Sequence, residues 1–195
     1  KNYQIIEHLL ETGHCKNISL HITTNGSVKI KDAWLDASKY FKRFAMEFSI
    51  DGGGNVYEYI RPGAKWDTLV DVINYTKHVA PETKWYFNYV AQALNAHCMD
   101  EDERMIMGLF DNVELDDEEW KNHVSVCYQM PEDSYLVVHP KLREKYGIDH
   151  WTEDFDFSED TYAKFMRKMA WLDKAHGTSL EKLNADFFDT SIYSK

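Results

Sequence analysis

Residues 44–61 read FAMEFSIDGGGNVYEYIR, and the rest of the chain is organised around this stretch. The apolar run at residues 44–50 predicts a β-strand that ends at Asp51 and three consecutive glycines. Glycine has no Cβ and tolerates positive φ, so such a run allows close approach to the backbone. Ligands of α/β folds bind at the carboxyl ends of strands, and we therefore expect Ser49 and Asp51 at the functional edge of a sheet.

Strands and helices alternate along the chain. Three further strands are predicted where β-branched, aromatic and other apolar residues gather between turn signals, at residues 18–23, 84–94 and 124–130. Helical spacing of apolar residues predicts helices at residues 2–11, 32–41, 67–78, 103–110 and 158–176. Shorter helical segments are expected at residues 116–122, at 140–147 and after Thr178. The alternation predicts βαβ units, a parallel sheet of four strands and therefore an α/β fold.

Composition narrows the class of protein. The chain has 195 residues and a formal net charge of −11, which argues against a nucleic-acid partner because phosphate binding needs clustered Lys and Arg. No apolar run approaches the ~20 residues of a transmembrane helix, so no membrane partner is expected. Cys15, Cys98 and Cys127 are far apart, which favours a cytoplasmic location over a disulfide scaffold. The three thiols also lack the spacing of a four-cysteine zinc or iron–sulfur site.

Polar residues follow the first two predicted strands. Asn25 follows the first strand, and the sequence Ser49-Ile50-Asp51-Gly52 ends the second, with Arg61 shortly after. One crossover helix separates the two strands, so we expect them to be neighbours and to form a site for a small ligand with hydroxyls and a carboxylate. Arginine suits bidentate carboxylate binding, and a surface salt bridge is the alternative for Arg61.

The glycine run itself has two interpretations. It could hold a phosphate, although neither GxGxxG nor GxxxxGK[ST] is present, or it could be a tight turn that needs small residues. His97 and Cys98 at the end of the third strand are interpreted as a loop histidine and a semi-buried thiol.

Four segments, in this order, carry a resemblance to a known family. They are LHITTNGS at residues 20–27, FSIDGGGNVYEYIRPGAKW at 48–66, VAQALNAH at 90–97 and VCYQMPEDSYLVVHPKL at 126–142. With these segments the chain resembles the radical S-adenosylmethionine (radical SAM) superfamily. In particular it resembles twitch domain-containing radical SAM proteins, which are common in phage and marine bacterial sequences.

The resemblance implies a partial (β/α)6 TIM-like barrel that binds a [4Fe–4S] cluster and S-adenosylmethionine. Such enzymes generate a 5′-deoxyadenosyl radical, which abstracts hydrogen from a substrate. Carried over to this chain, Asn25 would line the top of the barrel, and Ser49 and Arg61 would hold the methionine carboxylate of the cofactor. Asp51 and Gly52 would shape the turn beneath it, and Asn95 would face the substrate or cofactor.

The resemblance also implies a division of the chain. The family's CxxxCxxC segment follows the first barrel strand and is not among these residues. Residues 1–147 therefore resemble strands three to six, the C-terminal part of the barrel, and residues 148–195 form a helical extension. The cluster is expected only in a longer parent protein, so we expect this chain alone to hold no cluster and to cleave no S-adenosylmethionine.

Two expectations about partners follow. The strand at residues 18–23 would lie at a bare sheet edge, and bare edges recruit either a missing N-terminal half or a second copy of the chain. The rival to an enzyme is a non-catalytic α/β module, in which Ser49, Asp51 and Arg61 bind a nucleoside-like small molecule or a protein.

Overall fold

The computed structural model describes residues 2–92, 94–110, 124–129 and 159–177 of the chain, and every structural statement below concerns these residues. Four strands form one sheet: β1 (Ser19–Thr24), β2 (Arg43–Ile50), β3 (Lys84–Val90) and β4 (Val124–Gln129). All neighbours pair in parallel, in the order β1-β2-β3-β4. The prediction of an α/β fold with a parallel sheet is confirmed.

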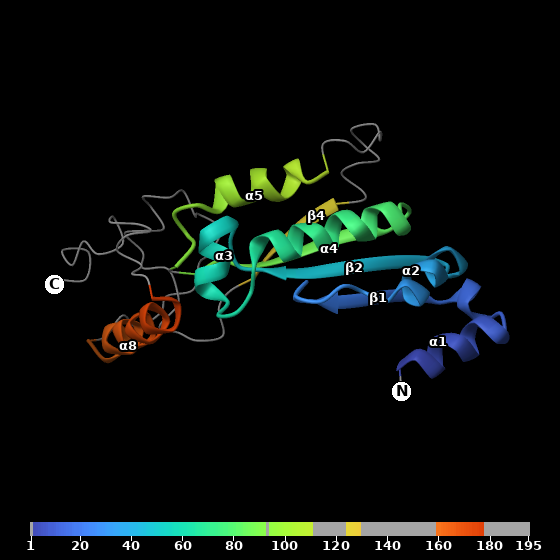
Figure 1. Ribbon diagram of the computed structural model, residues 1–195, viewed down its shortest axis with the longest axis horizontal. Coiled ribbons are helices and arrows are strands. Elements are labelled where there is room, and N and C mark those ends of the chain that lie inside the picture. The colour runs from blue at the N-terminus through green and yellow to red at the C-terminus, as the bar shows by residue number, and fades with distance from the viewer. Residues whose placement is uncertain (1, 93, 111–123, 130–158, 178–195) are drawn as a thin grey trace.

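Helices connect and extend the strands (Figure 1). They are α1 (Asn2–Glu11), α2 (Asp32–Ala37), α3 (Gly54–Ile60), α4 (Trp66–Val79), α5 (Met99–Gly108) and α8 (Glu159–His176), with short 3-10 helices at His14–Asn17 and Ser38–Tyr40. None of the helices in the described ranges is both long and apolar enough to cross a lipid bilayer.

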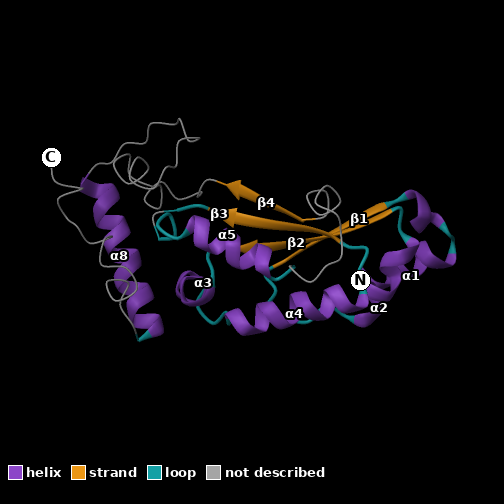
Figure 2. Cartoon of the chain, turned by 90° about the horizontal axis from the view of Figure 1, so that it is seen from above, coloured by secondary structure: helices purple, strands orange, loops and turns teal. Residues whose placement is uncertain are grey.

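The strand order places the connecting helices on one side of the sheet. Each strand pairs with the next one in sequence, and right-handed crossovers in a constant direction bring every connection over the same face. Figure 2 shows α3, α4 and α5 on that face, which we call the covered face. None of the described helices lies over the opposite face, which we call the open face.

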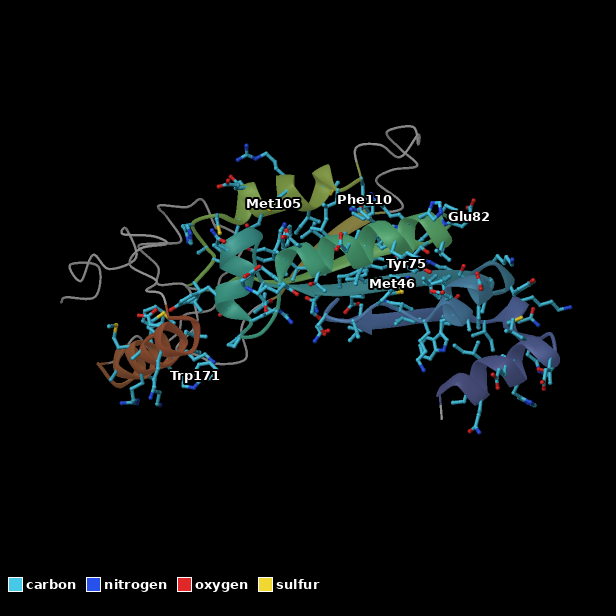
Figure 3. All side chains as sticks on the ribbon, in the orientation of Figure 1. Met46, Tyr75, Glu82, Met105, Phe110 and Trp171 are labelled. Atoms are coloured by element: carbon cyan, nitrogen blue, oxygen red, sulfur yellow. The ribbon has the colours of Figure 1, made fainter. Side chains whose placement is uncertain are left out.

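Alternate residues of β2 and β3 build the core on the covered face. The buried side chains are Phe44, Met46, Phe48 and Ile50 of β2 and Trp85, Phe87 and Tyr89 of β3. The Phe48 ring stacks on Trp85 and Phe87 with centroids 5.9 and 6.0 Å apart. Phe110, just after α5, meets the edges of the same two rings (Figure 3). Leu69 and Ile73 of α4 complete this core, and both are fully buried.

The open face carries polar residues that link neighbouring strands. His21 Nε2 of β1 lies 3.2 Å from Glu47 Oε2 of β2. The His21 ring also packs on Tyr86 of β3, with centroids 5.5 Å apart, and Arg43 donates a hydrogen bond to the Tyr86 hydroxyl. These contacts connect three neighbouring strands, β1, β2 and β3, on the open face.

The helix α8 packs beside α3, near the carboxyl ends of the strands (Figures 1 and 2). Phe165, Met169 and Leu172 are buried in the same core as the sheet. Tyr59 of α3 donates a hydrogen bond to Asp173 Oδ1 at 2.6 Å. The predicted helix at residues 158–176 is thus confirmed at Glu159–His176, and it is attached to the element that follows the glycine run.

The structure corrects three details of the sequence prediction. The third strand ends at Val90 and not at Leu94, because the Asn95 side chain turns the chain there through bonds to Val90 O and Gln92 N. The α3 helix was not predicted, and α5 begins at Met99, before the expected residue 103. The short helical segments expected at 116–122, at 140–147 and after Thr178, and the division at residue 147, lie outside the described residues.

Candidate functional site

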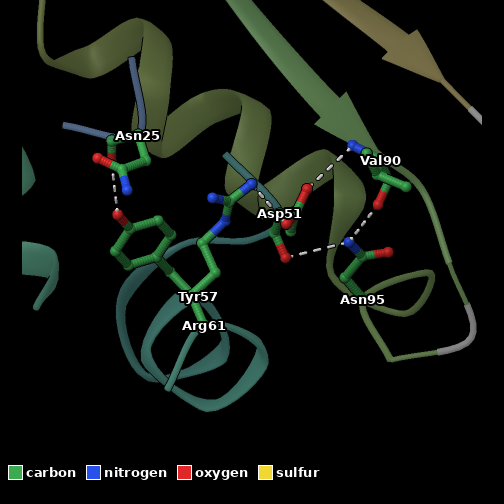
Figure 4. Close-up of polar contacts among 6 residues, drawn as sticks. All are labelled: Asn25, Asp51, Tyr57, Arg61, Val90 and Asn95. Carbon is green, nitrogen blue, oxygen red and sulfur yellow. Dashed lines mark hydrogen bonds and ion pairs between the residues drawn. The ribbon is translucent and has the colours of Figure 1, made fainter. Parts of the chain in front are cut away.

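The turn between β2 and α3 carries an ion pair at the carboxyl edge of the sheet. Arg61, at the end of α3, places Nη2 2.7 Å from Asp51 Oδ2 (Figure 4). The other carboxylate oxygen, Asp51 Oδ1, accepts a hydrogen bond from Val90 N at 3.3 Å. The carboxylate that meets Arg61 therefore belongs to the chain itself. Arg61 is one-quarter exposed, so this contact is more enclosed than the surface salt bridge considered from the sequence.

Burial and charge act in opposite directions on Asp51. Its burial raises the pKa of the carboxyl above the ordinary value, while the charge of Arg61 and the hydrogen bonds from Val90 and Arg61 oppose that rise. The net direction is upward, so burial is the larger effect. The charge of Asp51 at this edge consequently depends on its contact with Arg61.

Asn95 connects β3 to this turn. It is fully buried, and its Nδ2 donates hydrogen bonds to Asp51 O at 3.1 Å and to Val90 O at 2.8 Å (Figure 4). Its Oδ1 accepts a hydrogen bond from Gln92 N at 2.7 Å. Both amide donors are thus engaged with backbone carbonyls. In the structure, Asn95 joins the end of β3 to the turn after β2. Its predicted contact with a substrate or cofactor stays a prediction.

Asn25 lies at the same edge, after β1. Its Oδ1 accepts hydrogen bonds from Ser27 N and Ser27 Oγ at 3.1 and 2.8 Å, which closes a local turn. Its backbone carbonyl accepts a hydrogen bond from Tyr57 Oη of α3 at 3.1 Å (Figure 4). The expectation that β1 and β2 are neighbours is confirmed, and α3 joins their two ends.

The glycine run is explained by packing within the chain. Gly52 has a φ of +145°, and a Cβ there would lie 2.8 Å from Val56 Cγ1. A Cβ on Gly53 would lie 2.7 Å from Asp102 Oδ1 and 2.8 Å from Met105 Sδ of α5. Both positions exclude larger residues because α3 and α5 pack against the turn. These contacts favour the tight-turn interpretation over a phosphate site.

Two buried polar atoms near this edge have no hydrogen-bond partner among the described residues. They are Asn88 Oδ1, which accepts, and Arg61 Nε, which donates. Asn88 pairs in register with Ser49, and both residues belong to the open face, two residues before Val90 and Asp51 respectively. An unsatisfied buried polar atom costs about 1–3 kcal/mol. An acceptor would satisfy Arg61 Nε, and a donor would satisfy Asn88 Oδ1.

Asn88 was not identified from the sequence, although a signal was present. In the segment KWYFNYV at residues 84–90, the aromatic residues Trp85, Phe87 and Tyr89 alternate with Tyr86 and Asn88. Period-two alternation places the second set on the face opposite the core. Only the register with β2 then shows that Asn88 stands beside Ser49.

The described residues hold no group of three His, Cys, Asp or Glu side chains that could bind a metal ion. Cys15 is a buried free thiol after α1, and Cys98 is a free thiol that precedes α5. Comparison with protein-family models, with curated proteins and with solved structures finds no match to this chain. A functional proposal therefore depends on the sheet edge and its residues.

Proposed function

We propose that this chain is the C-terminal part of a radical SAM partial barrel and that it binds S-adenosylmethionine at the carboxyl ends of β1, β2 and β3. The strand order supports this proposal. Consecutive parallel strands with helices on a single face are the arrangement of a (β/α) barrel segment, whereas a doubly wound sheet carries helices on both faces. The open face would then be the inner surface of the barrel.

The observation that carries the proposal is a pair of polar atoms, beside a half-buried ion pair, that lack hydrogen-bond partners among the described residues. Arg61 Nε needs an acceptor and Asn88 Oδ1 needs a donor. The methionine part of S-adenosylmethionine offers carboxylate oxygens and an ammonium group. The ribose of its adenosine part offers hydroxyls. The opposite charges of Asp51 and Arg61 complement an amino-acid zwitterion.

The chain's residues take distinct parts in this proposal. Arg61 binds the methionine carboxylate through guanidinium nitrogens that do not contact Asp51, including Nε. Ser49, on the open face, binds the same carboxylate through its hydroxyl. Asp51 attracts the ammonium group and keeps Arg61 in place. Gly52 allows the turn that presents both, Asn25 borders the site at β1, and Asn95 braces it.

The described cysteines do not fit a [4Fe–4S] cluster. Cys15 and Cys98 belong to separate parts of the fold, and the thiol of Cys98 is engaged with Asp102. We place the cluster in a longer parent protein, where it would supply the electron that converts bound S-adenosylmethionine to a hydrogen-abstracting radical. This chain contributes the binding edge only.

Location and partners follow from the same proposal. We infer a cytoplasmic protein, because iron–sulfur chemistry and free thiols require reducing conditions. The outer edge of β1 pairs with no other strand among those described, and a strand from the N-terminal half or from a second copy would extend the sheet there.

A non-catalytic binding module is the second candidate. The observation in its favour is that Asp51 already neutralises Arg61 within the chain, so the edge is complete in charge without a cofactor. Such a module would bind a nucleoside-like ligand through the open face, and the amino-acid part of the ligand would add little affinity.

Calorimetry with two ligands separates the candidates. S-Adenosylmethionine carries the amino-acid part, and 5′-methylthioadenosine lacks it. We expect the chain to bind S-adenosylmethionine at least about tenfold more tightly, because a charge-assisted bidentate contact contributes more than ~1.4 kcal/mol. Equal affinities favour the module, and absence of binding by both ligands refutes the proposed site.

A further inference from the structure

Asp102 is a buried carboxylate with no part in the proposed contacts to the ligand. It lies in the first turn of α5 and is 2% exposed. Its Oδ1 accepts a hydrogen bond from Gly53 N at 2.7 Å, and its Oδ2 accepts hydrogen bonds from Tyr89 Oη at 2.6 Å and Cys98 Sγ at 3.1 Å. Burial of a carboxylate is costly unless donors surround it, and these donors come from the site turn, β3 and the start of α5.

The surroundings also determine which groups carry protons. Burial, together with the charge and hydrogen bond of Asp102, raises the pKa of the Cys98 thiol well above its ordinary value, so the thiol remains a donor. Burial raises the pKa of Asp102, and the hydrogen bonds from Tyr89, Cys98 and Gly53 oppose that rise. The net direction for Asp102 is upward, so burial is the larger effect, and the three donors lower the cost of its ionised form.

The contact with Gly53 connects Asp102 to the candidate site. Gly53 follows Asp51 in the turn, and a Cβ on Gly53 would lie within 2.7 Å of Asp102 Oδ1, so the carboxylate packs directly on the turn backbone. Asn95 holds the other end of the turn through Asp51 O. Two side chains that follow β3 thus hold the turn at both ends.

We infer that Asp102 is a positioning residue for the site: its charge-assisted hydrogen bond to Gly53 N fixes the turn that carries Asp51, and so sets where Arg61 meets the ligand. This inference rests on the proposed binding of S-adenosylmethionine at this edge. Asp102 contacts no ligand, and it acts through Gly53. Tyr89 and Cys98 orient the carboxylate because they occupy Oδ2 and leave Oδ1 to the turn.

Three variants of the ¹⁵N-labelled full chain test this role by NMR. Asp102→Asn keeps the size of the side chain and one acceptor, Asp102→Ala removes both, and Asp100→Asn is a matched control at an exposed residue of the same helical turn. The Gly53 amide proton is expected to move upfield in Asp102→Asn and to stay at its wild-type position in Asp100→Asn. The affinity for S-adenosylmethionine is expected to fall by about tenfold in Asp102→Ala and by less in Asp102→Asn.

Tyr89→Phe separates positioning from general stability. It removes a donor to Oδ2 and leaves the bond between Oδ1 and Gly53, so its melting temperature should fall while its ligand affinity falls less than that of Asp102→Asn. A purely structural role of Asp102 would instead make affinity follow melting temperature across all variants. That correlation would overturn the inference.

Two further outcomes separate this inference from the proposed function. An unmoved Gly53 amide in Asp102→Asn, or wild-type affinity in both Asp102 variants, overturns the positioning role while ligand binding by the wild type still supports the function. Absence of ligand binding by the wild-type chain, with a moved Gly53 amide, overturns the proposed function and the positioning role for that ligand.

Discussion

The two faces of the parallel sheet are made from alternate residues of the same strands, yet they differ in almost every property. On the covered face, Met46, Phe48 and Phe87 are fully buried in one core with residues of α4 and α5. On the open face, His21, Glu47 and Tyr86 form a polar chain, and Asn88 Oδ1 has no hydrogen-bond partner among the described residues. The difference indicates that the covered face supplies stability, whereas the open face and its carboxyl edge supply the candidate site.

The largest expected effect is the loss of a core ring on the covered face. Phe87→Ala should lower the free energy of unfolding by about 3–5 kcal/mol, because the Phe87 ring is fully buried and stacks on Phe48. Urea unfolding followed by tryptophan fluorescence measures this change. A loss below ~1 kcal/mol would contradict the assignment of the covered face as the core.

An intermediate effect is expected from the buried carboxyl of Asp102, which makes the free energy of unfolding depend on pH. Burial raises the pKa of Asp102 above its ordinary value of 3.8, so the folded state binds this proton more tightly than the unfolded state does. The stabilising contribution of Asp102 is fully present below that ordinary value and is lost as pH rises through the folded pKa. Each unit of such a rise corresponds to about 1.4 kcal/mol.

Asp102→Asn removes this titration. The stability of the variant relative to wild type should therefore improve as pH rises from about 4 to 7. Urea midpoints at several pH values, with Asp100→Asn as the exposed control, measure the trend. A relative stability that worsens with rising pH would show that the carboxylate is favoured by folding.

The smallest expected effect on stability lies on the open face. Asn88→Ala removes the unsatisfied oxygen, so the free energy of unfolding should change by less than ~0.5 kcal/mol or increase slightly. The same variant should bind S-adenosylmethionine several-fold more weakly. A large loss of stability, similar to that of Phe87→Ala, would mean that Asn88 serves the fold and not a ligand.

The comparison of the faces also explains what the sequence allowed us to predict. Apolar patterns and turn signals located the four strands of the described residues, because the alternation of buried and exposed side chains in a strand is visible in its local sequence. The α3 helix was missed, because Gly52, Gly53 and Gly54 favour a loop, and the turn before α3 is held by contacts with α5 and Asn95 that lie far along the chain.

The candidate site was predicted in part. Ser49, Asp51 and Arg61 lie at one sheet edge, as expected, because parallel strands end together. The sequence did not indicate that Arg61 binds Asp51, nor that Asp102 binds Gly53, which lies 49 residues before it. The first contact depends on how α3 packs beside the end of β2, and the second depends on how α5 packs against the turn. Local residue patterns carry no information about either packing.

The most direct test of ligand binding at the Asp51–Arg61 edge is a calorimetric titration of S-adenosylmethionine into wild type, Arg61→Ala and Arg104→Ala. Arg104 is the matched control, because it is exposed on α5 and its Nε donates only to the backbone carbonyl of Asp100. We predict binding by wild type, wild-type affinity in Arg104→Ala and at least about tenfold weaker binding in Arg61→Ala. Equal affinities of wild type and Arg61→Ala, or no binding by wild type, would contradict a cofactor site at this edge.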